Sequence, residues 1–313
     1  MITFGPVPSR RLGKSLGINN ITRQKVCSYS CLYCQVGVTQ KYSIVRQAFF
    51  EPGMILRETE AHLKKLLPSD IPDYLTFVSN GEPTLDINLG KSIRLLKKLG
   101  IPIAVITNAS MLWDSSVIEE LSEADWVSVK ADVGDKDTWK NLNRPASGLR
   151  FEDVIESLYG FASYYNGTLS TETMLCSGVN DSTGNISAVA AIIKRLDPDK
   201  AYISVPMRPP AEKSVFPPDA ERLNLAWQIF IENEIKTELL AGFEGVSTGY
   251  TGNMYEDILN ITAVHPLRED ALSELLEKNN SDFRTVQSLI DQGLIRCVKY
   301  RGMKFYLREL TIR

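Results

Sequence analysis

The 313-residue sequence is poor in histidine and contains no long apolar run. His62 and His265 are the only imidazole ligands available to a metal site. No apolar stretch approaches the ~18 residues of a membrane-spanning helix, so we expect no contact with a membrane. Repeats and low-complexity segments are also missing. The first residues, Met-Ile-Thr-Phe-Gly-Pro-Val-Pro, lack the apolar core of a signal peptide, and we therefore expect a cytoplasmic protein.

Acidic residues are absent from the first fifty positions, although the whole chain has a net charge of −3. This segment carries seven cations: Arg10, Arg11, Lys14, Arg23, Lys25, Lys41 and Arg46. One interpretation is a positive rim that attracts an anionic substrate or an acidic electron donor such as a flavodoxin or ferredoxin. The other is that carboxylates from elsewhere in the chain neutralise these cations.

Cysteine is also scarce, yet three of the five cysteines lie within eight residues, as Cys27, Cys31 and Cys34. In the cytoplasm thiols stay reduced, and clustered cysteines bind metal more often than they pair. Three thiolates on one loop can converge on an iron–sulfur cluster, zinc or copper(I). Three ligands are one too few for a closed structural site, so either a fourth comes from elsewhere or one position stays open for an exogenous ligand. A zinc knuckle or a group of buried cysteines is the simpler alternative.

The spacing C-x3-C-x2-C, with Tyr33 just before the last cysteine, resembles the signature of the radical S-adenosylmethionine (AdoMet) superfamily. This resemblance implies that Cys27, Cys31 and Cys34 hold a 4Fe–4S cluster whose fourth iron binds AdoMet, and that Tyr33 lies near the adenine. It also implies an activity: the cluster cleaves AdoMet reductively, and the resulting 5′-deoxyadenosyl radical takes a hydrogen atom from a substrate.

Strand and helix patterns alternate through most of the chain, which is long enough for one large α/β domain. The expected strands are 15–21, 74–79, 101–107, 126–131, 169–176 and 201–206, and the expected helices are 52–67, 88–99, 115–124, 151–165, 183–196 and 219–233. Such alternation requires parallel pairing with right-handed crossovers. The superfamily resemblance implies a partial (β/α)6 barrel with its site at the carboxyl ends of the strands. We expect this core at 15–242, after an extended arm at 1–14.

Polar residues follow the expected strands at that edge. The turn Asn80-Gly81-Glu82-Pro83 is similar to the Gly-Gly-Glu motif of radical AdoMet enzymes, which binds the methionyl ammonium group. By the same analogy, Asn108, Ser128 and Lys130 contact the AdoMet carboxylate or ribose. Ordinary hydrogen bonding at strand ends is the alternative for these three residues.

Two further features have open interpretations. The polar connection 132–150 is longer than the median loop and is a candidate substrate loop over the barrel mouth. Cys176, at a strand end, is either a hydrogen-atom donor or second-metal ligand, or a small buried hydrophobic residue.

The spacing of the apolar residues changes after a Gly/Ser/Thr-rich stretch at 243–253. Helical patterns at 255–262, 267–278 and 283–292 precede an alternating hairpin pattern at 294–300 and 303–310, an order that resembles a winged helix-turn-helix at 255–313. The last twenty residues hold six basic residues against the single acid Glu309. We expect this module to dock tRNA or a protein substrate, or to serve only as scaffold.

Several short segments also resemble a branch grouped with the wyosine-forming tRNA enzymes: Val-Pro-Ser-Arg-Arg-Leu-Gly near the start, Asn-Arg-Pro, and Arg-Pro-Pro-Ala-Glu. Those enzymes have extra amino-terminal cysteines, whereas the first cysteine here is Cys27. The sequence therefore predicts a radical AdoMet enzyme that acts on a macromolecule. The alternative from another class is an iron–sulfur, redox-responsive winged-helix regulator without AdoMet turnover.

Overall fold

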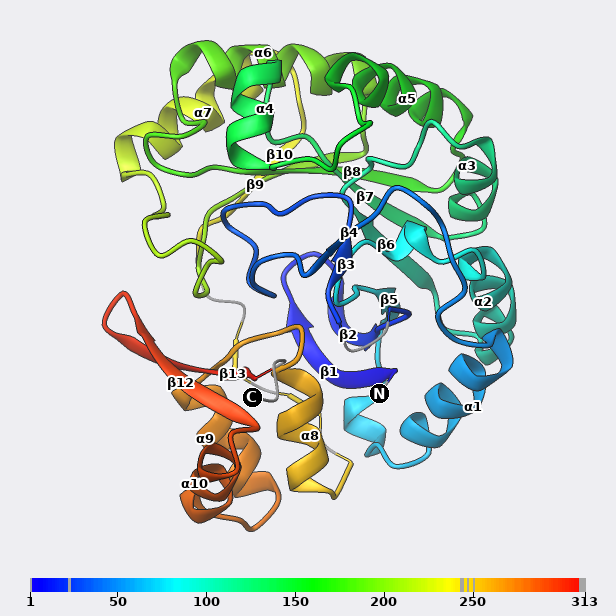
Figure 1. Cartoon of the computed structure of the whole chain (residues 1–313), viewed down its shortest axis with the longest axis vertical. Helices are drawn as coiled ribbons and strands as arrows, with labels where there is room; N and C mark the ends of the chain where they lie inside the picture. Colours follow the sequence, from blue (N-terminus) through cyan, green and yellow to red (C-terminus); the bar gives the residue numbers. More distant parts are fainter. Residues whose placement is uncertain (1, 22–23, 243–244, 247, 250, 310–313) are drawn as a thin grey trace.

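A curled sheet of eight strands forms the centre of the computed structural model, which describes residues 2–21, 24–242, 245–246, 248–249 and 251–309 (Figure 1). Seven of its strands run parallel, and β1 pairs antiparallel with β2 at one edge. The predicted partial barrel is confirmed. In spatial order the strands are β1 (Thr3–Ser9), β2 (Gly13–Ile18), β5 (Tyr74–Phe77), β6 (Ile103–Thr107), β7 (Trp126–Lys130), β8 (Thr168–Met174), β9 (Lys200–Ser204) and β10 (Thr237–Leu240).

Helices cover the convex side of this sheet (Figure 1). They are α1 (Pro52–Leu63), α2 (Leu89–Leu96), α3 (Ser115–Leu121), α5 (Phe151–Tyr164), α6 (Thr183–Leu196) and α7 (Ala220–Glu232). Side chains cap several of their first turns: Asp114 accepts from the backbone N–H of Ser116, and Ser182 accepts from that of Asn185. The short α4 (Lys136–Leu142) lies apart from this layer, within the predicted substrate loop.

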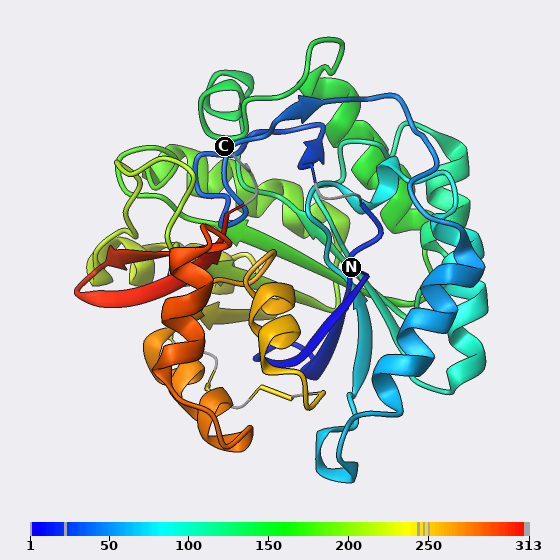
Figure 2. The same ribbon diagram turned by 60° about the horizontal axis from the view of Figure 1, so that its bottom comes forward.

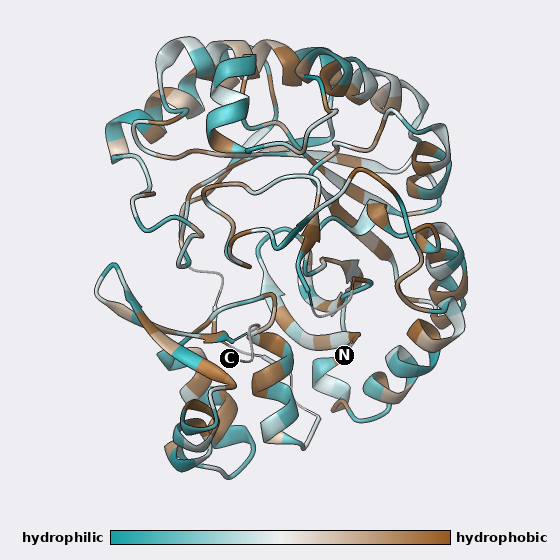
Figure 3. Ribbon diagram, viewed as in Figure 1, coloured by the Kyte–Doolittle hydropathy of each residue, from teal (hydrophilic) through white to brown (hydrophobic). Residues whose placement is uncertain are grey.

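The main hydrophobic core lies between the sheet and these helices. Phe77, Val105 and Val127 point outward from the strands and pack with Ile93 and Phe161 of the helices, all fully buried. Figure 3 shows hydrophobic positions on the strands and polar positions on the outer faces of the helices. Burial of each such side chain contributes about 1.5–3 kcal/mol, which fixes the strands and therefore the side chains that project to the concave side.

The amino-terminal segment predicted as an extended arm is a strand of the main sheet. Its turn at residues 10–12 reaches the opposite edge, where the Arg10 guanidinium donates to the carbonyl oxygen of Leu239 at 2.9 Å. Leu12 packs with Trp126 and Leu240 in a separate apolar cluster. The turn therefore bridges the two edges of the half-barrel and closes its lower end, where β2 and β7 begin.

The carboxy-terminal part contains the three predicted helices and the predicted hairpin, with one additional short strand (Figure 2). Its elements are α8 (Met254–Ile261), β11 (Leu267–Arg268), α9 (Glu269–Lys278), α10 (Phe283–Asp291), β12 (Ile295–Tyr300) and β13 (Met303–Arg308). Phe4 and Val7 of β1 share a buried cluster with Ile258, Leu272 and Leu275 of these elements. The winged-helix assignment and the division of the chain at 242 and 255 stay predictions.

Among the described residues, no helix is both long and apolar enough to cross a membrane.

Candidate functional site

The three clustered cysteines lie on one loop whose backbone is held from both sides. Strand β3 (Val26–Cys27) pairs with β4 (Lys41–Tyr42), and Cys27 and Tyr42 are register partners. On the other side the Leu32 N–H donates to the carbonyl oxygen of Leu142 at 2.9 Å. A tight turn follows, in which the Cys34 N–H donates to the carbonyl oxygen of Cys31 at 3.1 Å. These backbone bonds orient the loop toward the concave side of the sheet.

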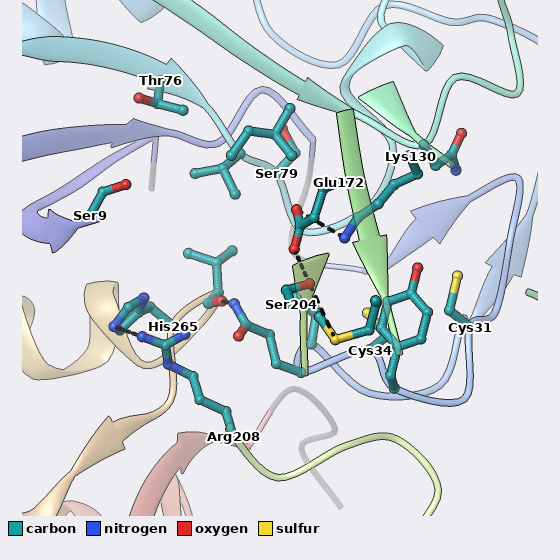
Figure 4. Close-up of a pocket in the computed structure, with 18 of the residues that line it drawn as sticks. Ser9, Cys31, Cys34, Thr76, Ser79, Lys130, Glu172, Ser204, Arg208 and His265 are labelled. Carbon is teal, nitrogen blue, oxygen red and sulfur yellow. Dashed lines mark hydrogen bonds and ion pairs between the residues drawn. The ribbon is translucent and has the colours of Figure 1, made fainter. Parts of the chain in front are cut away.

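A cavity of about 310 Å³ lies between this loop and the sheet (Figure 4). Its lining includes all three cysteines and the carboxyl-terminal part of several strands, together with the amino-terminal hairpin and His265 of the carboxy-terminal part. The predicted residues Tyr33, Gly81, Glu82, Asn108 and Lys130 also line it. The structure therefore brings five predicted cofactor-binding residues and three predicted metal ligands to one cavity.

Four other predicted residues, Asn80, Pro83, Ser128 and Cys176, do not line this cavity. Asn80 faces a second cavity on the other side of its turn, and the Pro83 carbonyl accepts from the Asn20 amide at 3.0 Å. Ser128 is buried on β7, two residues before Lys130 and on the same face of the strand. Cys176 is buried in a cluster with Cys27, Tyr29 and Trp139, where desolvation raises the pKa of its thiol. Its environment fits a small buried hydrophobic residue.

Each of the three clustered sulfurs has an N–H donor beside it. The Lys25 ammonium group donates to Cys34 Sγ at 3.1 Å, the Asn143 amide to Cys31 Sγ at 3.4 Å and the Asn108 amide to Cys27 Sγ at 3.6 Å. Outer groups of this kind orient thiolate ligands and tune the centre that they hold. Three independent donors to three sulfurs are the pattern expected for iron–sulfur ligands, and a purely apolar packing of thiols would not need them.

The three thiols of the loop differ in their electrostatic surroundings. Burial raises the pKa of Cys27 to about 12 and that of Cys31 to about 11. At Cys34 burial acts in the same direction, but the adjacent Lys25 outweighs it and lowers the pKa. Burial also opposes the charge of Lys25, and the three thiols, Cys34 foremost, outweigh that effect and raise the lysine's pKa. Two of the three sulfurs thus stay protonated until a metal replaces their protons.

Within the described part of the chain, no three His, Cys, Asp or Glu side chains converge as the ligands of a single metal ion would. A cubane cluster needs no such convergence, because each thiolate binds a different iron. The arrangement therefore fits a cluster better than the zinc knuckle considered from the sequence.

The turn at residues 80–83 is built onto the cysteine loop. Gly81 has φ +152°, and a Cβ atom there would lie 1.8 Å from the carbonyl oxygen of Val26, so only glycine allows this approach. The next N–H, that of Glu82, donates to the same oxygen at 3.1 Å. Gly81, Glu82 and the cysteines, about fifty residues apart in sequence, thus form one continuous wall of the cavity.

Glu82 is buried and accepts several hydrogen bonds. Its carboxylate accepts hydrogen bonds from the Thr107 hydroxyl at 2.6 Å, the Thr84 hydroxyl at 2.7 Å and the Asn108 N–H at 2.8 Å. Burial raises the pKa of this carboxyl, and the hydrogen bonds act against that rise. Glu82 therefore ties the turn to the end of β6 and places the Asn108 side chain beside Cys27.

A charged group on the concave face was not predicted from the sequence. Glu172 of β8 accepts from the Ser204 hydroxyl at 2.8 Å and from Lys130 at 3.0 Å (Figure 4). It also accepts from Arg11 at 2.7 Å. Burial would raise the pKa of Glu172, but Lys130 and Arg11 outweigh it and hold the pKa well below its usual range. An ionised Glu172 fixes Lys130, whose ammonium group lies 5.4 Å from the Tyr33 ring centre. The signal in the sequence was the inward parity of Ser170 and Glu172 on their strand.

The carboxy-terminal part contributes to the cavity wall. Arg208 lies 2.9 Å from His265 Nε2 (Figure 4). The Gln35 amide donates to the carbonyl oxygen of Val264 at 2.9 Å. Burial and the neighbouring Arg208 lower the pKa of His265 well below its usual value, so this ring is neutral and accepts from the guanidinium. His62, the other histidine, lies outside this cavity and contacts the Gly5 carbonyl oxygen at 2.8 Å.

Comparisons with known proteins agree on one family. The sequence model of the Radical SAM superfamily matches residues 21–186. A UPF0026 protein of Methanocaldococcus jannaschii is 43% identical over 316 aligned residues, which cover 100% of this chain and 97% of the relative.

One solved structure shows the fold likeness, and a second is reported beside it. A radical SAM methyltransferase from Sphaerobacter thermophilus has a TM-score of 0.52 and 15% identity, with coverage of 72% of this chain and 66% of the other. A structure of TYW1 with a lysine-pyruvate adduct has a TM-score of 0.49 and 14% identity, with coverage of 95% of this chain and 81% of the other.

Proposed function

Because the chain belongs to the Radical SAM superfamily and to the UPF0026 proteins, and is therefore an enzyme of this class, we propose that Cys27, Cys31 and Cys34 are the ligands of its cluster. Enzymes of the superfamily use a 4Fe–4S cluster and AdoMet. The single observation that carries the assignment is that each of the three sulfurs lines one cavity and has its own N–H donor. When bound, the two cofactors supply reductive cleavage of AdoMet to a 5′-deoxyadenosyl radical.

The AdoMet site is proposed along the wall that joins the cysteines to the strand ends. Tyr33, Gly81, Glu82, Asn108 and Lys130 line it, and all five come from the segments that the family motifs occupy. Glu172 holds Lys130 at this wall as an ammonium ion, able to bind a carboxylate. Asn80 and Pro83 shape the turn from behind. Ser128, one step deeper on β7, is proposed to support Lys130 rather than to touch the cofactor.

The remaining groups of the cavity restrict what reacts there. The turn at residues 10–12 closes the lower end of the half-barrel, and Arg11 carries its charge to Glu172. Phe4, Val7 and Leu12 add apolar surface to the wall opposite the cysteines. A cavity that is closed at its lower end and partly apolar limits the access of water and other hydrogen donors to a reactive radical. The chain thus binds and orients the cofactors and protects the radical from side reactions.

The substrate is proposed to be a macromolecule, tRNA or a protein, that docks on the carboxy-terminal part. His265 and Val264 of that part line the cavity, so a molecule bound there lies beside the reacting centre. Part of the positive charge of the hairpin is neutralised internally, since Lys304 pairs with Glu269 at 2.7 Å and Arg296 with Glu309 at 3.4 Å. Binding of bulk tRNA with a steep salt dependence supports a nucleic acid, and salt-insensitive capture of a protein supports a peptide.

Radical SAM enzymes need an electron donor. A flavodoxin or ferredoxin is proposed here, since both are acidic and the cysteine loop lies in a segment without acidic residues. The family assignment favours this enzymatic function over the redox-responsive regulator, which would need no AdoMet-binding wall.

Iron content tests the ligand assignment. Anaerobically reconstituted wild-type protein is expected to contain about four irons per chain and to bind AdoMet. Cys31→Ala should lose most of the iron and the visible absorption of the cluster. Cys297→Ala is the matched control, because Cys297 is exposed on β12 and far from the loop in sequence. Equal iron contents in the two variants would refute the assignment.

A further inference from the structure

A second hollow lies on the outer side of the cysteine loop, away from the cavity. Its volume is about 410 Å³, and it is lined by Tyr42, Lys136, Trp139, Lys140, Arg144, Pro145, Ala146, Ser147, Leu149 and Arg150. Four of these residues are cations and none is an acid. All of them except Tyr42 belong to the connection 132–150 that was predicted as a substrate loop, and no residue of 133–150 lines the cysteine cavity. This segment therefore covers the cysteine loop from outside and does not form a loop over the reacting centre.

Two of the four cations lack acidic partners. Arg144 pairs with Glu212 at 2.6 Å and Arg150 with Asp153 at 3.7 Å. Lys136 and Lys140 are exposed on α4, and neither makes an ion pair with any residue that the structure describes. Lys136 and Lys140 thus present positive charge to solvent at the hollow, and the acids nearest to them in sequence, Asp135 and Asp137, are not part of its lining.

Only a thin wall separates the hollow from the cysteines. Tyr42 in the hollow is the strand partner of Cys27. Trp139 in the hollow donates from its indole N–H to the Tyr29 hydroxyl at 3.1 Å, and the two rings pack edge to face with centres 5.8 Å apart. Tyr29 in turn lines the cavity. One strand pair and one aromatic pair therefore connect the outer surface with the metal ligands.

We propose that this hollow is the docking surface for the acidic electron donor, a reduced flavodoxin or ferredoxin; the inference rests on the proposed function. One electron passes from the reduced flavin or iron–sulfur centre of the donor to the cluster, so that the donor is oxidised, the cluster is reduced and no bond forms. A donor needs proximity and complementary charge, and the hollow provides both. A substrate must instead bring a C–H bond into the cavity, and the hollow and the cavity share no lining residue.

Charge reversal on α4 tests this docking surface. The double variant Lys136→Glu with Lys140→Glu is compared with Lys91→Glu plus Lys98→Glu, which makes the same charge change on and next to α2, where neither lysine has an ion pair in the described chain. Formation of 5′-deoxyadenosine is measured with reduced flavodoxin and, separately, with dithionite, which needs no docking surface. We expect the α4 variant to lose about tenfold or more of kcat/KM with flavodoxin at low salt, and to keep its rate with dithionite. The control variant should keep both rates.

Several results would overturn the proposal: an unchanged flavodoxin rate, an equal loss in the control, or an equal loss with dithionite. Weaker tRNA binding by the α4 variant at an unchanged flavodoxin rate would assign the hollow to a nucleic acid instead. A wild-type protein that is inactive with dithionite would refute the proposed function. Direct titration of the chain with flavodoxin needs no turnover. If the measured affinity depends on Lys136 and Lys140, the docking surface is supported independently of the proposed enzymatic function.

Discussion

The ion pairs of Glu172 offer a stability test of the cavity wall. Its carboxylate side chain is 8% exposed, and its partners Arg11 and Lys130 are 14% and 17% exposed. Glu172→Gln keeps the size and the hydrogen bond from Ser204, but it removes the negative charge that Arg11 and Lys130 share. Removal of one member of a buried ion pair costs about 3–5 kcal/mol. We expect a loss of about 3 kcal/mol in the free energy of unfolding at pH 7, measured by urea denaturation.

The matched control is Glu238→Gln, which removes the 3.2 Å ion pair to Lys200 on the neighbouring strands. There the side chains are 38% and 46% exposed, and an exposed pair contributes about 0–1 kcal/mol. A loss below about 1 kcal/mol for Glu172→Gln, equal to that of the control, would contradict the reasoning.

The pH dependence of the free energy of unfolding gives a second, independent test of the charge on Glu172. The folded state holds the pKa of Glu172 below its value in the unfolded chain, so its contribution is fully present above the unfolded pKa of about 4.3. The contribution is lost as the pH falls through the folded pKa. The stability difference between wild type and Glu172→Gln should therefore be constant from pH 7 to pH 5 and shrink in stronger acid.

Further predictions concern the turn, the buried histidine and the cluster. Gly81→Ala should lower the melting temperature strongly and impair iron retention, because its Cβ would meet the Val26 carbonyl, whereas Gly184→Ala, with no neighbour within 4 Å, should be neutral or slightly stabilising in thermal melts. The folded state lowers the pKa of His265, so the stability contributed by its neutral ring is present above pH ~6.5 and lost as the pH falls. His265→Gln should flatten the decline in unfolding free energy between pH 7.5 and 5.5, and an unchanged slope would contradict the assignment. Removal of the cluster with a chelator and oxidant should abolish visible absorption but leave the far-ultraviolet circular dichroism intact, since backbone bonds such as Leu32 to Leu142 hold the cysteine loop.

Much of the half-barrel could be predicted because buried parallel strands are continuous apolar runs between amphipathic helices. The strands near 103–107, 126–130 and 200–204 are of this type. β10 was missed, since Thr-Glu-Leu-Leu is short and only its last residue is buried. β1 was expected only as an extended arm, because Gly5 and the prolines beside it argue against regular pairing; its partners on α8 lie some 250 residues away.

The residues of the candidate site also fall into those that could be predicted from the sequence and those that could not. Residues in short local motifs, such as Cys31 and Gly81, could be located from spacing. The role of Glu172 could not be predicted in this way, because strand parity places it only on the inward face and its partners Arg11 and Lys130 are distant in sequence. The position of α4 was also hidden, since only the fold shows that the segment 136–146 contacts the cysteine loop.

Formation of 5′-deoxyadenosine tests the central claim most directly. Anaerobically reconstituted protein is incubated with dithionite and AdoMet, and 5′-deoxyadenosine and methionine are quantified over time. The account predicts that wild type and Cys297→Ala form both products in equal amounts and that Cys31→Ala forms neither. Product formation by Cys31→Ala at the wild-type rate, or none by reconstituted wild type that contains its iron, would contradict it.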